Sequence, residues 1–126
     1  MNEDIRSYRD LAAWQNARDL AIAVYRMTTA FPADERFGLV TQMRRSAVSI
    51  AANIAEGYGR GRALDYARFL RMARGSLFEL ESHAEIAAAL GLLDSESRNA
   101  VQERIDLAAR PLSGLLRSVE SKADQQ

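Results

Sequence analysis

Apolar residues recur at steps of three and four along four stretches of the chain, roughly residues 8–30, 33–57, 63–91 and 94–119. The third stretch is typical, because one such row contains Leu70, Ala73, Leu77, Leu80 and Ala84. This spacing gathers apolar side chains on one face of an α-helix, whereas a half-buried strand alternates at every second residue. The sequence therefore predicts an all-α chain of four helices without a strand.

The expected helix ends carry their usual signals. Ser7 and Asp10 form a capping-box pattern before the first helix. Pro32, followed by two acids, is expected to open the second helix, because a first turn needs no amide at that position and favours negative charge. Gly91 is expected to end the third helix in a left-handed conformation. Pro111 predicts a kink inside the fourth, after which residues 120–126 are expected to fray.

The composition limits the class of protein. A chain of 126 residues is expected to form one domain around a single core. Four helices with short connections pack most simply as an antiparallel up-down-up-down bundle. The absence of cysteine excludes disulfides and thiolate chemistry. An acidic N-terminus and uncharged runs far shorter than the ~20 residues that span a bilayer predict a cytoplasmic protein with no membrane contact.

The segment from Arg44 to Arg62 reads "RRSAVSIAANIAEGYGRGR" and ends in three alternating glycines. A phosphate-binding loop would need a preceding strand, and none is predicted here. The glycines are better explained as a turn between two helices, with Gly57 or Gly59 in a left-handed conformation.

The same helix has small or apolar residues on several faces. Within one bundle, Val48, Ala51, Ala52 and Ala55 would form an apolar strip on the outer side. A helix without a broad polar face is usually surrounded, so a second subunit is the expected cover. Asn53 would then be buried, and its amide would need hydrogen-bond partners.

The segments "DLAAWQNA", "FPADERFGLVTQMRRSAVSIAANIAEG", "YARFLRMARGSLFELE" and "LGLL" resemble bacterial four-helix-bundle proteins related to the reading frames in intervening sequences of large-subunit ribosomal RNA genes. That family is similar to the accessory variability protein of diversity-generating retroelements, a five-subunit ring that binds nucleic acid and a reverse transcriptase. The resemblance implies a homopentamer. It implies nucleic-acid binding less strongly, because those accessory proteins are basic and this chain has no net charge.

Arg44 and Arg45 match the arginine pair of the family motif. One hypothesis gives them phosphate contacts, and the other pairs them with carboxylates. The candidate carboxylates are Glu56, Glu79 and Glu81, which belong to the same motifs. Because buried arginines need partners, we expect the structural role, in a network that also includes Asn53.

Charge is distributed unevenly along the chain. Residues 36–74 carry a net charge of +6 and residues 79–106 carry −5. The basic part includes the candidate nucleic-acid contacts Arg60, Arg62, Arg68, Arg71 and Arg74. A basic stripe is typical of a nucleic-acid surface. The alternative is a solvated or intersubunit face, with Asp65 placed to pair with Arg68.

Several other residues permit a functional and an ordinary interpretation. Tyr58, between glycines, could stack on a base or pack on a neighbouring helix. Glu79 and His83 share a helix face, but a single histidine makes a metal site improbable. Trp14 and Phe78 have the spacing of core residues.

No nucleophile–base pair and no cofactor fingerprint is present in the sequence. The sequence therefore predicts a non-catalytic, cofactor-free homo-oligomeric scaffold or adaptor that binds itself and a protein partner. The alternative function is a ring that binds RNA or DNA and assists a reverse transcriptase or an RNA-processing partner.

Overall fold

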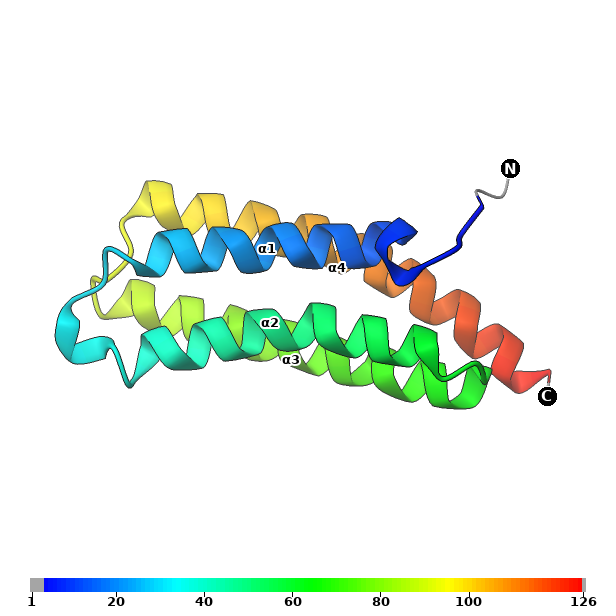
Figure 1. Ribbon diagram of the computed structural model, residues 1–126. Coiled ribbons are helices and arrows are strands. Elements are labelled where there is room, and N and C mark those ends of the chain that lie inside the picture. Colours follow the sequence, from blue (N-terminus) through cyan, green and yellow to red (C-terminus); the bar gives the residue numbers. More distant parts are fainter. Residues whose placement is uncertain (1–3, 126) are drawn as a thin grey trace.

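The computed structural model describes residues 4–125 and is all-α, with four helices and no strand among those residues (Figure 1). The helices are α1 (Ala12–Thr28), α2 (Leu39–Gly59), α3 (Ala63–Ala89) and α4 (Ser95–Asp124). Two 3₁₀ turns, Tyr8–Asp10 and Ala33–Glu35, precede α1 and α2. The predicted fold class is therefore confirmed at the level of its helices.

Each helix contacts the next along the chain, and α1 also contacts α4. The α1–α2 and α3–α4 connections lie at one end of the molecule, and the α2–α3 connection lies at the other (Figure 1). The core lies between the four helices. Its largest fully buried side chains come from all of them: Leu20, Val24, Met43, Ile50, Ile54, Leu70, Leu80, Ile105 and Leu112.

The start of the second helix differs from the prediction. Pro32 and the two acids after it form only a 3₁₀ turn, and α2 begins at Leu39. Gly38, with φ −103° and ψ −112°, lies outside helical geometry and separates the two. The carboxylate of Glu35 accepts a hydrogen bond from the Leu39 amide at 3.3 Å, which satisfies one free donor of the new helix. The Ser7–Asp10 capping box is also present, but it caps the short turn before α1.

The left-handed glycine between α2 and α3 is Gly61, with φ +79°, so the assignment to Gly57 or Gly59 was wrong. Both of those glycines are helical, and Arg60 continues the right-handed conformation as the C-cap. The prediction for Gly91 is confirmed, because its φ is +79°. The amide of Leu92 donates to the Ala87 carbonyl at 2.9 Å, as in a Schellman motif.

The fourth helix is longer than predicted and continues to Asp124. Val119 is buried, and Glu120 forms a 2.6 Å ion pair with Arg71 of α3, so tertiary contacts hold the turn that was expected to fray. Pro111 lies inside the helix, as predicted. The C-terminal half of α4 changes direction and runs toward the end of the α2–α3 pair (Figure 1). Among the described residues, no helix is both long and apolar enough to cross a bilayer.

Candidate functional surfaces

An open apolar groove of about 420 Å³ lies between α1 and α2. Its large apolar side chains remain accessible: Ile22 is 42% exposed, and Tyr25 and Val48 are each 45% exposed. Trp14, Ala21 and Ala51 complete the apolar lining. Val48 and Ala51 belong to the outer strip predicted from the sequence; Ala52 is exposed and Ala55 is half-buried. The structure adds the α1 side of the groove, which sequence reasoning had missed.

The side chain of Arg44 is tied to the last turn of α1. Its Nε donates to the hydroxyl of Thr28 at 2.9 Å, and one terminal nitrogen donates to the Tyr25 carbonyl at 3.2 Å. The guanidinium also lies 4.6 Å from the centre of the Tyr25 ring. The predicted carboxylate partners of Arg44 are therefore wrong within the chain, because the Thr28 hydroxyl and the Tyr25 carbonyl take that place. Arg45 is exposed.

Asn53 and the three carboxylates make their contacts with residues outside the predicted interface network. Asn53 is half-buried and donates to the carbonyl of Ser49 at 2.9 Å and to its hydroxyl at 3.0 Å. The Ser49 hydroxyl lies 2.9 Å from that of Ser76 on α3, so this short polar chain links α2 and α3.

The three carboxylates of that network have different partners. Glu56 accepts from Arg60 at 2.7 Å, and Glu81 accepts from Gln102 of α4 at 2.9 Å. Glu79 lies 3.9 Å from the Nε2 of His83. Among the described residues, no group of three metal-ligating side chains is gathered in one place.

The candidate nucleic-acid arginines divide into two sets. Arg60 and Arg71 pair with Glu56 and Glu120. Arg68 lies 4.8 Å from the centre of the Phe69 ring, and the expected Asp65–Arg68 ion pair is absent from residues 4–125. Arg62, the N-cap residue of α3, and Arg74 are both exposed. The five residues are thus accessible, but they do not form one uncommitted basic ridge.

Tyr58 packs within the molecule. Its ring meets the ring of Tyr66 edge to face at 6.2 Å, which is the ordinary interpretation of its sequence position. The hydroxyl of Tyr66 is buried without a hydrogen-bond partner among the described residues. Burial, with a smaller contribution from Tyr58, raises the pKa of Tyr66 to about 12.

Phe78 was predicted to lie in the core. Its side chain is 60% exposed, so that prediction was wrong.

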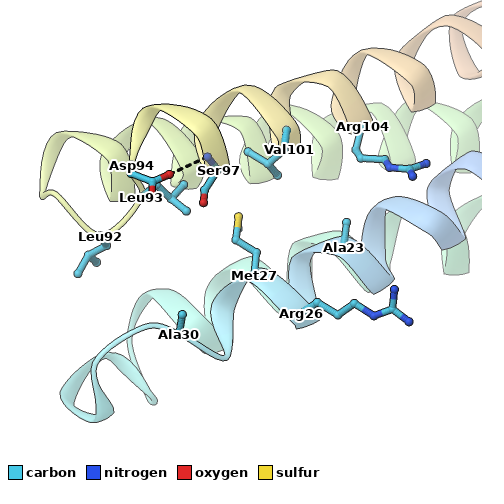
Figure 2. A pocket seen from close by; sticks show the side chains of 11 residues that line it. Ala23, Arg26, Met27, Ala30, Leu92, Leu93, Asp94, Ser97, Val101 and Arg104 are labelled. Atoms are coloured by element: carbon cyan, nitrogen blue, oxygen red, sulfur yellow. Dashed lines mark hydrogen bonds between the residues drawn. The ribbon is translucent and has the colours of Figure 1, made fainter.

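A second cavity, of about 440 Å³, lies where the end of α1 meets the start of α4 (Figure 2). Met27, Leu93 and Val101 give it an apolar floor, and Arg26 and Arg104 lie on its rim. The carboxylate of Asp94 accepts from the Ser97 amide at 2.8 Å and caps α4, so it serves the helix. This hydrogen bond lowers the pKa of Asp94.

The fold and its surfaces define a four-helix all-α protein with an exposed apolar groove and several arginines committed to contacts within the chain. The 23S rRNA-intervening sequence protein family matches residues 9–114, and the chain belongs to that family. The family resemblance predicted from the residues is therefore confirmed. Comparison with curated proteins gave no match.

A solved structure supports the same fold. The chain is similar to the crystal structure of a protein of unknown function from the S23 ribosomal protein family of Bacteroides thetaiotaomicron, with a TM-score of 0.77. The two are 18% identical, and the similarity covers 83% of this chain and 95% of that one. At this identity the similarity concerns the fold alone.

Proposed function

We propose that the protein is a non-catalytic scaffold whose helices form an up-down-up-down bundle and whose copies assemble into a ring, with five subunits on the family resemblance. The α1–α2 groove is the contact between neighbouring copies. The observation that carries this proposal is the set of large apolar side chains left accessible in that groove, Ile22, Tyr25 and Val48.

Burial of these side chains supplies the driving force. Each Å² of apolar surface removed from water contributes roughly 25 cal/mol. The groove is lined mainly by apolar side chains, with Arg18 and Arg26 as its charged members, so a partner surface that covers it would bury few polar groups. A second copy of the chain is the partner that is always present at the same concentration. Small residues such as Ala51 and Ala52 allow a helix of that copy to approach the groove closely.

The groove can be tested by light scattering coupled to size-exclusion chromatography. A glutamate at position 48, Val48→Glu, places a charge in the contact and is expected to convert the ring to a smaller species. The matched control is Ile5→Glu, which alters a side chain of similar exposure, 40%, outside the helices. A monomeric wild type, or a ring that survives Val48→Glu, would contradict the proposal.

A ring that binds RNA or DNA is the second candidate function. The family takes its name from an intervening sequence of 23S rRNA. Arg62 and Arg74 are exposed and, among the described residues, outside any ion pair. If this function holds, a pool of short RNA and DNA will shift the mass of the wild-type oligomer, and the shift will shrink as salt rises. Arg62→Gln and Arg74→Gln will then lower the salt dependence, whereas an unchanged mass favours the scaffold.

A further inference from the structure

The outer side of α3 carries a row of exposed residues that begins at Leu64 and ends at Ala89. The row advances by alternating steps of four and three residues, and each of its members is exposed. An average step of 3.5 residues is the spacing at which two helices pack along their whole length with a small crossing angle. The row therefore provides a continuous surface for another helix.

The middle of this row joins two features that the chain alone does not explain. Gly75 lies inside a helix of 27 residues, where only proline is less favourable than glycine. A Cβ atom at Gly75 would meet nothing within 4 Å, so no contact of its own chain requires a glycine. Three residues later, Phe78 is 60% exposed. A hollow and a large apolar side chain thus lie side by side on one surface.

We propose that α3 pairs with α3 of a second copy in antiparallel orientation, about a two-fold axis that passes between Gly75 and Phe78. Phe78 of each copy packs over the partner's Gly75. A two-fold contact joins the same surface on both copies. Once Phe78 lies over the partner's Gly75, the alignment of the two helices is fixed. Each other residue of the row then faces one particular residue of the partner's row, and each such pair forms a layer of the contact.

The remaining layers of this register are complementary. Leu64 faces the partner's Ala89, a large residue against a small one. Arg71 faces the partner's Ser82 and keeps its own ion pair with Glu120.

The charged layer brings Arg68 against the partner's Glu85. Among residues 4–125, Arg68 forms no ion pair. Glu85 accepts from Arg98 at 2.6 Å, and a carboxylate has capacity for a further donor.

Charge selects the antiparallel orientation over the parallel one. On the exposed side of α3, the arginines at positions 68, 71 and 74 precede Gly75, and Glu79 and Glu85 follow Phe78. An antiparallel partner therefore places the basic half of each helix on the acidic half of the other. A parallel partner would place Arg68 on Arg68 and Phe78 on Phe78, and like charges in contact repel.

The α3 contact uses a different face of the molecule from the α1–α2 groove. A substitution can therefore disrupt one contact without the other, and the two proposals can be refuted independently. Sedimentation velocity of four proteins distinguishes them: the wild type, Val48→Glu, Gly75→Leu and the double variant. Gly75→Leu places a side chain in the hollow, where a Cβ atom meets nothing of its own chain within 4 Å. We expect Val48→Glu to leave a dimer of 14.0 kDa subunits, Gly75→Leu to halve the wild-type mass, and the double variant to be monomeric.

Asn99→Leu, an equivalent change at an exposed position of α4, is the control and should leave the mass unchanged. A monomeric Val48→Glu, or a wild-type mass that Gly75→Leu does not alter, would overturn the α3 pairing. Circular dichroism of each variant verifies that it is folded.

Charge reversal tests the register. Arg68→Glu and Glu85→Arg should each weaken the dimer formed by Val48→Glu by about tenfold or more, since close charge pairs at interfaces contribute on this scale. The double reversal, Arg68→Glu with Glu85→Arg, should restore the affinity because both charges exchange across the two-fold axis. A double variant as weak as the single ones would refute the proposed layers.

Discussion

Arg44 and Arg45 are neighbours in the sequence and have different surroundings in the fold. A helix turns by about 100° per residue, so adjacent side chains cannot share a face. Arg44 lies against the end of α1, where it donates to a side-chain hydroxyl and to the Tyr25 carbonyl. A cation at a helix C-terminus is also favoured by the helix dipole. Arg45 is exposed.

Arg44→Met should therefore lower the free energy of unfolding by about 1.5–3 kcal/mol, the range for hydrogen bonds to charged groups. Arg45→Met is the matched control and should change it by less than about 0.5 kcal/mol, as is usual for surface positions. Urea unfolding followed by circular dichroism measures both. Equal losses for the two variants would show that the contacts with α1 are not what distinguishes Arg44.

Tyr66 carries a buried hydroxyl without a partner among the described residues. Its pKa of about 12 lies above the usual value near 10, so folding favours the neutral phenol. The corresponding stability is fully present below pH 10 and is lost as the pH rises from about 10 to 12.

Tyr66→Phe removes both the unpaired hydroxyl and its titration. Near pH 8 the variant should be as stable as the wild type or more stable, because no hydrogen bond is lost. Near pH 11 the difference should grow in favour of Tyr66→Phe. Urea unfolding at the two pH values measures the change, and a difference that is independent of pH would contradict the burial of this phenol.

At the scale of elements, α2 and α3 approach each other closely where Gly57 lies. A Cβ at this position would come within 2.8 Å of the Cβ of Phe69 and within 3.3 Å of a backbone carbonyl. The polar contact between Ser49 and Ser76 lies along the same pair of helices. Small residues on α2 thus serve packing within the chain as well as the outer groove.

Gly57→Ala should destabilise the protein by about 1–3 kcal/mol, because the neighbouring backbone must move to admit a methyl group. Gly59→Ala is the control on the same helix, since a Cβ there meets nothing within 4 Å. That change should be neutral or slightly stabilising, as alanine favours a helix over glycine. Thermal unfolding of both variants measures the difference, and similar melting temperatures would exclude the close approach.

The helix ends were predictable where the chemistry of a single residue sets them. Gly91 ends α3 because the chain needs a left-handed residue there and the next amide can reach back to α3. The three alternating glycines all permit that conformation. The packing of Gly57 against α3 excludes a turn at that residue, and the chain turns at Gly61.

At the scale of the whole molecule, α1 shows that the spacing of apolar residues predicts a helix but does not predict which of its faces is buried. Its apolar residues cover more than one face. The buried row contains Ala13, Ala17, Leu20 and Val24, whereas Tyr25 lies in the groove. Rotation of α1 by one residue about its axis would bury Tyr25 and expose Val24. Close packing of the core against the other helices excludes that rotation.

The two proposed contacts also belong to this scale. In the proposed assembly, the α1–α2 groove joins copies in a ring, and the outer row of α3 joins copies in pairs. Both use side chains that the bundle leaves accessible, Val48 in one case and Phe78 in the other. Contiguous exposed apolar surface, as in the groove, commonly marks an interaction site.

The sequence by itself determined four helices, the helix end marked by Gly91, and the family, because periodicity, capping and motifs depend on residues close together in the chain. The tertiary structure decided which face of α1 is buried, where α2 begins and ends, and which partner Arg44 takes. It also brought α1 against α2 to form the groove. These features depend on the fit between helices distant in sequence, and local patterns carry no information about that fit.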